Sequence, residues 1–397
     1  MAININRLEK DLLELAKFSD TDNGITRLSF TPTYSKGRNY VEDLMKEAGL
    51  KTRIDSVGNL IGRIEGKDSN KKVIAFGSHI DTVPNGGKYD GSIGVLGAIE
   101  IIRTLQEMDY VPIHPLEVIS FINEEGSAPV NIGGVFGSQA MMGLTKINED
   151  FEKELSKIGL SKKDINNSYR EPEQFKCYLE IHIEQGKELE NNHLSIGVVT
   201  GIVGTWRFMV KVQGTASHAG TTPMDQRDDA LLKSLPIIQH VNQIAKDINM
   251  GMVGTVGNVM VKPGASNVVP GEVVFTVEFR SIKNEYLEKA IELLQEKIGS
   301  IKGAQLKEIS KSYPVMLSDD LQDLISKVCE GNSISYTKLP SFAGHDARET
   351  AKNIQSALIF IPCRNGISHS PLEFASKIDI ENGVNVLLET IKKLDAK

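Results

Sequence analysis

In the first half of the chain and near its end, hydrophobic residues occur in two patterns: at helical spacing and in short continuous runs. Apolar residues that recur at helical spacing, as Val41, Leu44 and Ala48 do before Gly49, predict a helix with a glycine stop. Short apolar runs predict buried strands. Strands that alternate with helices indicate a largely parallel sheet that is covered on both faces. The pattern predicts strands at 73–76, 116–122 and 357–361, helices at 93–105 and 380–394, and an exposed helix and loop at 152–167.

The pattern changes near Thr205, where strict alternation of period two begins. Trp206, Phe208, Val210 and Val212 occupy every second position, which predicts a half-buried strand. A helix at 228–248, strands at 252–261 and 273–280, a helix at 285–298 and a strand at 305–310 follow. This β-α-β-β-α-β order is that of the ferredoxin-like fold.

The α/β pattern resumes after Pro314, so the second domain is inserted into the first. We therefore predict a mixed α/β fold whose largely parallel sheet is flanked by helices. It consists of a first domain at 1–205 and 317–397 and an inserted ferredoxin-like domain at 206–316.

Composition and charge narrow the function classes. The 397 residues carry a net charge of −7, which argues against a nucleic-acid binder but leaves a small anionic substrate possible. The three cysteines form no Cys-x-x-Cys pair, so we expect free thiols in a reducing compartment. No signal peptide and no apolar run of about 20 residues is visible, so we expect a cytoplasmic protein without a membrane partner.

Histidines and carboxylates gather where predicted strands end. His79 follows the apolar strand predicted at 73–76, and Asp81 points the same way in an extended chain and could hold the second imidazole nitrogen. Asp90 follows in a glycine-rich turn that opens the next helix, where a carboxylate can bridge two cations. Taken alone, a His-x-Asp pair is more often a capped turn with a hydrogen-bonded histidine.

Three further clusters follow the same rule. The adjacent Glu124 and Glu125 come directly after the predicted strand at 116–122, so one could bind metal while the other handles a proton. His182 alternates with Glu180 and Glu184 on one face of a predicted strand, and His369 follows a later strand and turn. Each cluster alone could be a solvated turn, but together they can hold two divalent cations. Nitrogen and oxygen ligands without thiolate suit Zn²⁺ or Mn²⁺.

These motifs resemble a known family. The chain resembles the N-carbamoyl-L-amino acid hydrolase and allantoate amidohydrolase branch of the metal-dependent aminoacylase and carboxypeptidase superfamily. The sequence His182-Ile183-Glu184-Gln185-Gly186 marks this branch, because other branches usually place a carboxylate at the position of His182. The resemblance covers nearly the whole chain and rests on residues 77–90, 123–126, 182–186, 217–224, 344–347 and 367–371.

The resemblance implies a role for each matching residue. One metal would take His79 and His182, the other Glu125 and His369, and Asp90 would bridge them. Two divalent cations per subunit are implied, Zn²⁺ or Mn²⁺, with Co²⁺ or Ni²⁺ as alternatives in vitro. Glu124 would be the general base, Asp81 would orient His79, and His218 would donate to the oxyanion from the neighbouring subunit of a homodimer formed through the inserted domain. The implied substrate-binding residues are Gln185, His218, Asn267, Arg280, Gly344 and His345.

The implied activity is hydrolysis of the carbamoyl or ureido C–N bond of a small carboxylate. An aminoacylase or dipeptidase and a catalytically silent binding protein of the same fold remain alternatives. A phosphatase or nuclease also uses two metals, but no basic patch surrounds these motifs. The chain departs from the family pattern at Ala128-Pro129, where an Arg-Phe-type pair is usual, and this leaves the preferred substrate side chain open.

Overall fold

The computed structural model describes residues 2–249 and 251–396, which divide into two compact units. The first comprises Met1–Thr200 and Met316–Lys397, and the second Gly201–Val315. The inserted unit thus begins five residues earlier and ends one residue earlier than the predicted segment at 206–316.

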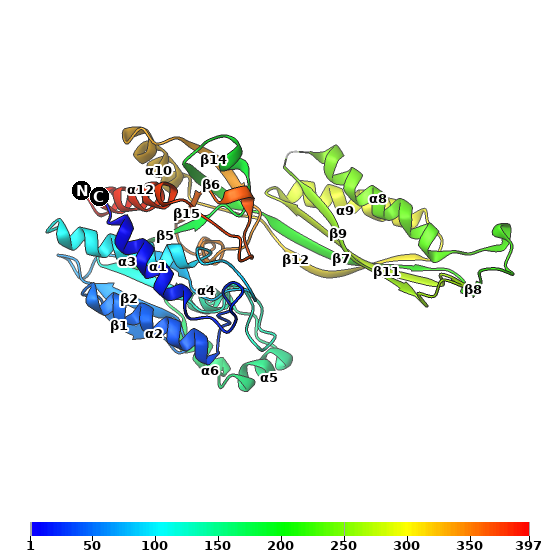
Figure 1. The fold of residues 1–397 in the computed structure, drawn as a ribbon, viewed down its shortest axis with the longest axis horizontal. Coiled ribbons are helices and arrows are strands. Elements are labelled where there is room, and N and C mark those ends of the chain that lie inside the picture. The colour runs from blue at the N-terminus through cyan, green and yellow to red at the C-terminus, as the bar shows by residue number, and fades with distance from the viewer. Residues whose placement is uncertain (1, 250, 397) are drawn as a thin grey trace. The chain divides into compact units, whose positions relative to one another are not determined.

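A nine-stranded sheet forms the centre of the first unit (Figure 1). Its four central strands, β4, β3, β5 and β15, are mutually parallel, and antiparallel strands extend both sides. This confirms the predicted mixed, largely parallel sheet. The strands in spatial order are β1 (Lys51–Ile54), β2 (Leu60–Ile64), β4 (Leu116–Phe121), β3 (Val73–His79), β5 (Phe175–Ile183), β15 (Ser356–Ile361), β6 (Ile196–Ile202) and β13 (Val315–Met316), with β14 (Tyr336–Ser341) paired to β6.

Helices cover both faces of this sheet, as the side chains of β5 show. The side chain of Ile181 lies against the position of Gly383 in α12, whereas the Glu180 carboxylate accepts from the Ala347 amide of α11. Adjacent strand residues point to opposite faces, so α12 and α11 lie on opposite sides. The helices are α1 (Ile5–Ala16), α2 (Pro32–Glu47), α3 (Ser92–Glu107), α4 (Phe136–Met141), α5 (Glu149–Lys157), α6 (Lys162–Ser168), α7 (Glu188–Asn191), α10 (Asp319–Gly331), α11 (Asp346–Thr350) and α12 (Lys377–Asp395).

The second unit has a four-stranded antiparallel sheet in the order β12-β7-β11-β9, with α8 and α9 packed on one face (Figure 1). Trp206, Phe208, Val210 and Val212 of β7 all point into its core, as their spacing predicted. The order is the predicted β-α-β-β-α-β. Its elements are β7 (Gly204–Gln213), β8 (Ser217–His218), α8 (Ala230–Ile248), β9 (Val253–Lys262), β10 (Val268–Val269), β11 (Glu272–Ser281), α9 (Asn284–Gly299) and β12 (Ala304–Ser312).

Two sequence expectations need correction. The charged stretch at 152–167 belongs to two short helices, α5 and α6, rather than to one helix and a loop. Strand β5 ends at Ile183, so Glu184 does not continue the face that carries Glu180 and His182. The Glu184 carboxylate instead accepts from the amides of Glu188 and Leu189 at the start of α7, at 2.7 and 2.9 Å.

The three cysteines are all buried and unpaired. Burial raises the pKa of each thiol to about 12. Within residues 2–249 and 251–396, no helix combines the length and the apolar character that crossing a membrane requires.

Candidate metal centre

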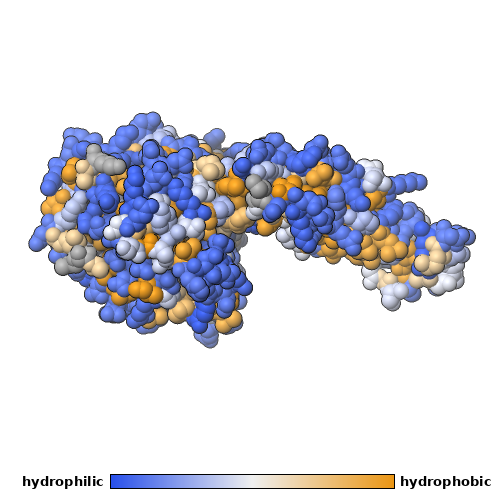
Figure 2. Space-filling model, turned by 90° about the horizontal axis from the view of Figure 1, so that it is seen from above, coloured by the Kyte–Doolittle hydropathy of each residue, from blue (hydrophilic) through white to orange (hydrophobic). Residues whose placement is uncertain are grey.

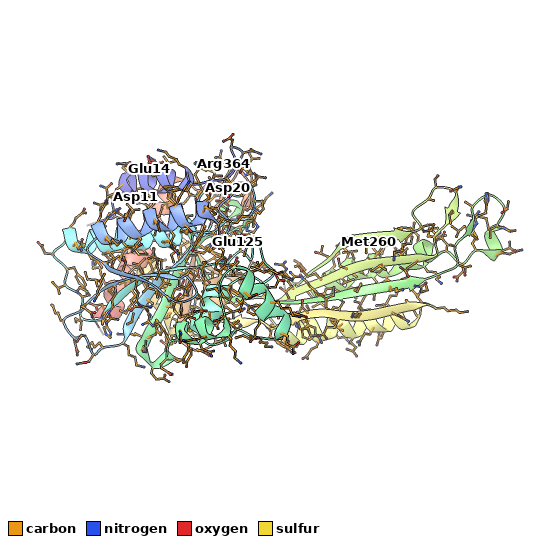
Figure 3. The ribbon with its side chains drawn as sticks, turned by 90° about the horizontal axis from the view of Figure 1, so that it is seen from below. Asp11, Glu14, Asp20, Glu125, Met260 and Arg364 are labelled. Atoms are coloured by element: carbon orange, nitrogen blue, oxygen red, sulfur yellow. The ribbon has the colours of Figure 1, made fainter. Side chains whose placement is uncertain are left out.

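The predicted site residues converge at one edge of the parallel strands. His79 ends β3, Glu124 and Glu125 follow β4, His182 lies one residue before the end of β5, and His369 follows β15. These four strands are parallel neighbours, so the residues at their carboxyl ends meet at the same edge of the sheet. Figure 3 labels Glu125 in this region.

Asp90 lies at the centre of this cluster, just before α3. Its Oδ1 is 3.1 Å from His182 Nε2 and 3.5 Å from His79 Nε2, and its Oδ2 is 3.5 Å from His369 Nε2. Burial works to raise the pKa of Asp90, but the neighbouring His182 and His79 lower it well below its usual range. One carboxylate oxygen thus faces two imidazoles and the other faces the third, which is the arrangement expected of a bridging ligand.

The two adjacent glutamates contact different imidazoles. Glu124 Oε2 is 3.6 Å from His79 Nε2, and Glu125 Oε2 is 3.4 Å from His369 Nε2. Burial and the charge of Glu125 raise the pKa of Glu124. Burial also raises the pKa of Glu125, although its hydrogen bond with His369 acts against this. Ligand atoms of His79, Glu124 and Glu125 lie within 4.8 Å of one another, so both glutamates belong to the same cluster.

The donor atoms fit two cations. Ligand atoms of His79, Asp90 and His182 lie within 4.8 Å of one another, as do those of Asp90, Glu125 and His369. The two groups share only Asp90, and they contain nitrogen and oxygen but no sulfur, which suits Zn²⁺ or Mn²⁺.

The charges in the cluster also favour cations. Burial lowers the pKa of His182, but Asp90 raises it to a net value of about 9, and the hydrogen bond to Glu125 raises the pKa of His369 to about 9. The buried carboxylates therefore attract positive charge, which divalent cations would supply.

The sequence predicted that the Asp81 carboxylate holds the second imidazole nitrogen of His79, and the structure differs from this prediction. The atom that meets His79 Nδ1 is the Asp81 backbone oxygen, at 3.0 Å, while the carboxylate is 3.7 Å away. The carboxylate oxygens instead accept from the amides of Glu124 and Glu125, at 3.2 and 3.1 Å. Asp81 therefore fixes the two-glutamate segment by its side chain and the imidazole by its main chain.

His182 is oriented in a similar way. Its Nδ1 lies 2.8 Å from the Ile183 carbonyl oxygen, so Nδ1 carries the proton and Nε2 faces Asp90. Gly91 has a left-handed φ of 60°, and a Cβ there would come within 2.4 Å of the His79 ring. A glycine is therefore required for the turn to bring Asp90 against the imidazoles.

Sequence reasoning missed two residues that hold Asp90. Ser368 Oγ lies 2.7 Å from Asp90 Oδ2 and 3.0 Å from Glu373 Oε2. Glu373 is buried, and its Oε1 accepts from the amides of Tyr89 and Asp90, at 2.9 and 3.1 Å. The position of Ser368 directly before His369 was a signal that could have been used, whereas nothing in the sequence pattern marks Glu373.

Three predicted substrate-binding residues lie in the first unit. Gln185 Nε2 donates to Asp90 Oδ2 at 2.7 Å, while its Oε1 is buried without a hydrogen-bond partner. The buried His345 packs edge-on against His182, with ring centroids 4.5 Å apart, and burial together with His182 lowers the pKa of His345. Gly344 is exposed, with no atom within 4 Å of the position that a Cβ would take. Gln185 and His345 thus contact the proposed metal ligands directly.

The other predicted substrate-binding residues belong to the second unit. His218 of β8 is exposed, and its Nδ1 accepts from the amides of Gly220 and Thr221, at 3.0 and 3.2 Å. Asn267 is its neighbour, because β10 pairs with β8 and the Asn267 oxygen accepts from the Ala219 amide. Arg280 lies in β11, where its Nε donates to Glu278 Oε1 at 2.6 Å.

Comparison with known proteins identifies the family. Residues 75–393 match the sequence profile of peptidase family M20/M25/M40, and the chain belongs to this family of metal-dependent hydrolases. The chain is 39% identical over 99% of both chains to an N-carbamoyl-L-amino-acid amidohydrolase from a Pseudomonas species. It is 35% identical to the allantoate amidohydrolase of Bacillus subtilis, over 95% of this chain and 94% of the relative.

The solved structures agree with this assignment. A crystal structure of a hydantoinase/carbamoylase family amidase from Burkholderia multivorans superimposes with a TM-score of 0.89 and 32% identity, over 100% of this chain and 99% of the other. The predicted branch and enzyme class, hydrolases of carbon–nitrogen bonds other than peptide bonds, are thereby confirmed at the level of the named relatives.

Proposed function

We propose that the protein hydrolyses the carbamoyl or ureido C–N bond of a small carboxylate, such as an N-carbamoyl-L-amino acid or allantoate. The observation that carries this proposal is the pair of ligand groups that share Asp90, with Glu124 beside them. The names of the relatives support the substrate class.

His79 and His182 would hold one cation, Glu125 and His369 the other, and Asp90 would bridge them. Two divalent cations bound there would polarise the scissile carbonyl and make a water easier to deprotonate. Glu124 accepts the proton of the attacking water, because burial and neighbouring carboxylates raise its proton affinity. Glu124 then returns this proton to the departing nitrogen, and the C–N bond breaks.

His218 supplies a donor for the carbonyl oxygen. Its Nδ1 accepts two backbone amides, so the ring proton lies on Nε2, which is the atom left to donate. Such a donor stabilises the charge that develops on the oxygen in the transition state. The Arg280 guanidinium suits the substrate carboxylate, Asn267 adds a polar contact beside His218, and Gln185, Gly344 and His345 line the metal side.

A single chain cannot bring all of these anchors to one small substrate. His218 pairs with Val268 near one end of β11, and Arg280 lies near the other end of this ten-residue strand. Eight residue steps from Glu272 to Arg280 span about 27 Å in an extended strand. We therefore propose a homodimer in which Arg280 of one subunit and His218 and Asn267 of the partner subunit contact the same substrate.

The inserted unit offers a surface for this dimer. Strand β9 is an edge of its sheet, and Val253, Val259 and Met260 expose between 44% and 49% of their surface there. Hydrophobic side chains are visible on the surface of this unit in Figure 2, and Met260 is labelled on β9 in Figure 3. Leu232 and Leu235 of the adjacent α8 are exposed as well. An unpaired edge with exposed apolar side chains is suited to pair with a second copy.

The activity is tested on Mn²⁺-loaded protein with N-carbamoyl-L-amino acids, allantoate and the matching N-acetyl amino acids. We expect ammonia release from the carbamoyl or ureido compounds. Turnover of only the N-acetyl compounds would identify an aminoacylase, and no turnover of any compound with metal bound would contradict the proposal. Glu124→Gln should keep its metal and lose at least ~10²-fold in rate, the usual scale of general-base catalysis.

The dimer is tested by mixing inactive subunits. His218→Ala and Glu124→Gln chains should regain activity in mixed dimers, because one of the two sites then has both an intact Glu124 and an intact partner His218. Homodimers of each variant are the controls. Verified mixed dimers without any recovery would show that His218 acts within its own chain.

A further inference from the structure

One buried arginine, Arg27, spans the loop that joins two parts of the metal centre. This connecting loop, residues 80–91, runs from His79 at the end of β3 to Asp90 and Gly91 before α3. Arg27 is 1% exposed, and its side chain is among the largest that are fully buried. It belongs to neither of the two ligand groups that share Asp90.

The guanidinium donates a hydrogen bond at each end of the connecting loop. Its Nε donates to the Ile80 carbonyl oxygen at 2.8 Å, directly after His79. Its Nη2 donates to Ser92 Oγ at 3.3 Å, at the first residue of α3 and two residues after Asp90. One rigid planar group therefore links the two points of the chain beside His79 and Asp90.

The main chain around Arg27 holds the middle of the same loop. The Arg27 amide donates to Thr82 Oγ1 at 2.9 Å, and the Thr82 amide donates to the Arg27 carbonyl oxygen at 3.2 Å. Ile25 and Gly86 exchange two further main-chain hydrogen bonds, at 2.9 and 2.8 Å. The segment at 25–27 therefore lies along the connecting loop and fixes the point from which the Arg27 side chain starts.

The third nitrogen of the guanidinium is anchored at the end of α1. Nη1 donates to the carbonyl oxygens of Leu15 and Phe18, at 2.9 and 3.1 Å. These oxygens lie at and just beyond the C-terminal end of α1, where the helix dipole favours a cation. Burial lowers the pKa of Arg27 to about 10, while the nearby Asp81 carboxylate acts to raise it, so the guanidinium remains charged at neutral pH.

A glycine in α2 leaves room for the Arg27 side chain. A Cβ at Gly37 would lie 2.8 Å from Arg27 Cδ and 3.5 Å from its Nε. The guanidinium is held by acceptors from α1, the connecting loop and α3, so the stem cannot move away from α2 without breaking these hydrogen bonds. The α2 helix therefore confines Arg27 to the conformation that reaches both ends of the loop.

We infer that Arg27 is a positioning residue of the metal centre. By holding Ile80 and Ser92 together, it sets the separation between His79 and Asp90, whose Nε2 and Oδ1 atoms are 3.5 Å apart. Its side-chain hydrogen bonds go to neighbours of the ligands in sequence and not to the ligands themselves. This inference rests on the proposed ligand set, which a separate control tests.

The contact with Ile80 also acts on the two glutamates. Ile80 directly precedes Asp81, whose main-chain oxygen meets His79 Nδ1 at 3.0 Å. The Asp81 carboxylate accepts from the Glu124 and Glu125 amides. A displacement of Ile80 would therefore move both the imidazole and the segment that carries the glutamates.

Metal affinity is the direct readout, because it needs no substrate. Competition with a chromogenic chelator measures Zn²⁺ binding to the full-length protein, at a temperature where every variant is folded. Arg27→Met should bind Zn²⁺ at least about tenfold more weakly than the parent, as is usual when a residue that orients metal ligands is removed. The absorption spectrum of bound Co²⁺, which reports the geometry of the ligands, should change as well. Unchanged affinity and an unchanged spectrum would overturn the inference.

Arg170→Met is the matched control for the loss of a guanidinium. The Arg170 side chain is 12% exposed and pairs with Glu117, near the start of β4 and so at the end of this strand opposite to Glu124. Arg170→Met should lower the unfolding midpoint but keep the metal affinity and the Co²⁺ spectrum of the parent. Equal losses of affinity in Arg170→Met and Arg27→Met would show a general effect of stability and would overturn the inference.

Ser92→Ala tests the link to α3 in a variant that disturbs the fold little. It removes the hydroxyl that accepts from Arg27 and leaves the three carbonyl acceptors in place. We expect Zn²⁺ binding to weaken about three- to tenfold, the effect of one lost hydrogen bond. Added to Arg27→Met, the Ser92→Ala change should cost nothing more, because the bond is already absent. Additive losses, or no loss in Ser92→Ala, would overturn the inference.

His79→Ala separates this inference from the ligand assignment on which it rests. If His79→Ala bound as many cations as the parent, the ligand set would be wrong, and the inference would fall with it. If His79→Ala lost a cation while Arg27→Met and Ser92→Ala bound Zn²⁺ as the parent does, the ligand set would stand and the role of Arg27 alone would be refuted.

Discussion

Asp81→Asn tests whether the segment with the two glutamates must be fixed for catalysis. The carboxylate accepts from the Glu124 and Glu125 amides at 3.2 and 3.1 Å. An asparagine of the same shape keeps one acceptor oxygen and turns an NH₂ group toward the other amide. One charge-assisted hydrogen bond, worth about 1.5–3 kcal/mol, is lost. A shift of Glu124 by about 1 Å is enough to cost on the order of 10²-fold in rate.

We therefore expect kcat to fall about 100-fold, with metal still bound and KM changed little. Steady-state kinetics and metal analysis of the purified variant measure these quantities. Asp55→Asn is the matched control, because the Asp55 carboxylate also accepts several backbone amides and burial raises the pKa of both aspartates. Removal of the charge therefore affects stability in a similar way in both variants. If Asp81→Asn and Asp55→Asn lost the same fraction of kcat, the positioning argument would be refuted.

Further predictions concern the support of the metals and the dimer. Gly91→Ala should purify with less metal, because its Cβ would lie 2.4 Å from the His79 ring at a left-handed φ, and full metal content would contradict this. Glu373→Ala leaves two buried amides without their acceptor and should weaken metal binding 10- to 100-fold by titration, where an unchanged affinity would be the contrary result. Chelation should abolish activity and lower the unfolding midpoint, and Mn²⁺ should restore both, whereas activity that survives verified metal removal would exclude the proposed mechanism. Met260→Asp should yield monomers in size-exclusion chromatography if β9 forms the dimer interface, and an unchanged elution volume would exclude this surface.

The strands that the sequence predicted are either buried along their whole length or buried on one face. Strands β3, β4 and β15 are buried along their whole length, and β7 alternates between core and surface, so their composition reflects their position. Strand β1 is mostly exposed, and β14 is only partly buried, so neither carries an apolar pattern. Their existence depends on pairing with β2 and β6, which no local pattern records.

The residues of the candidate site also divide into those that the sequence predicted and those that it did not. Residues at or shortly after strand ends, such as His79 and Glu124, were predictable because the carboxyl ends of parallel strands meet at one edge of the sheet. Glu373 could not be predicted, because a loop distant in sequence brings it to the Asp90 amide. Glu184 was assigned to the wrong face because the alternation of β5 continues by one step beyond the end of the strand at Ile183. Local periodicity does not show where hydrogen bonding to the neighbouring strand stops.

The length of strand β11 has a consequence for how the protein behaves at different concentrations. Arg280 lies near one end of β11, and His218 of β8 lies beyond the other end, so the proposed substrate site is complete only while two chains are associated. Dilution below the dissociation constant of the dimer would then abolish activity without unfolding either chain. Specific activity would rise with total protein until every subunit is paired, so that the amount of protein in the cell sets the fraction of working sites as well as their number.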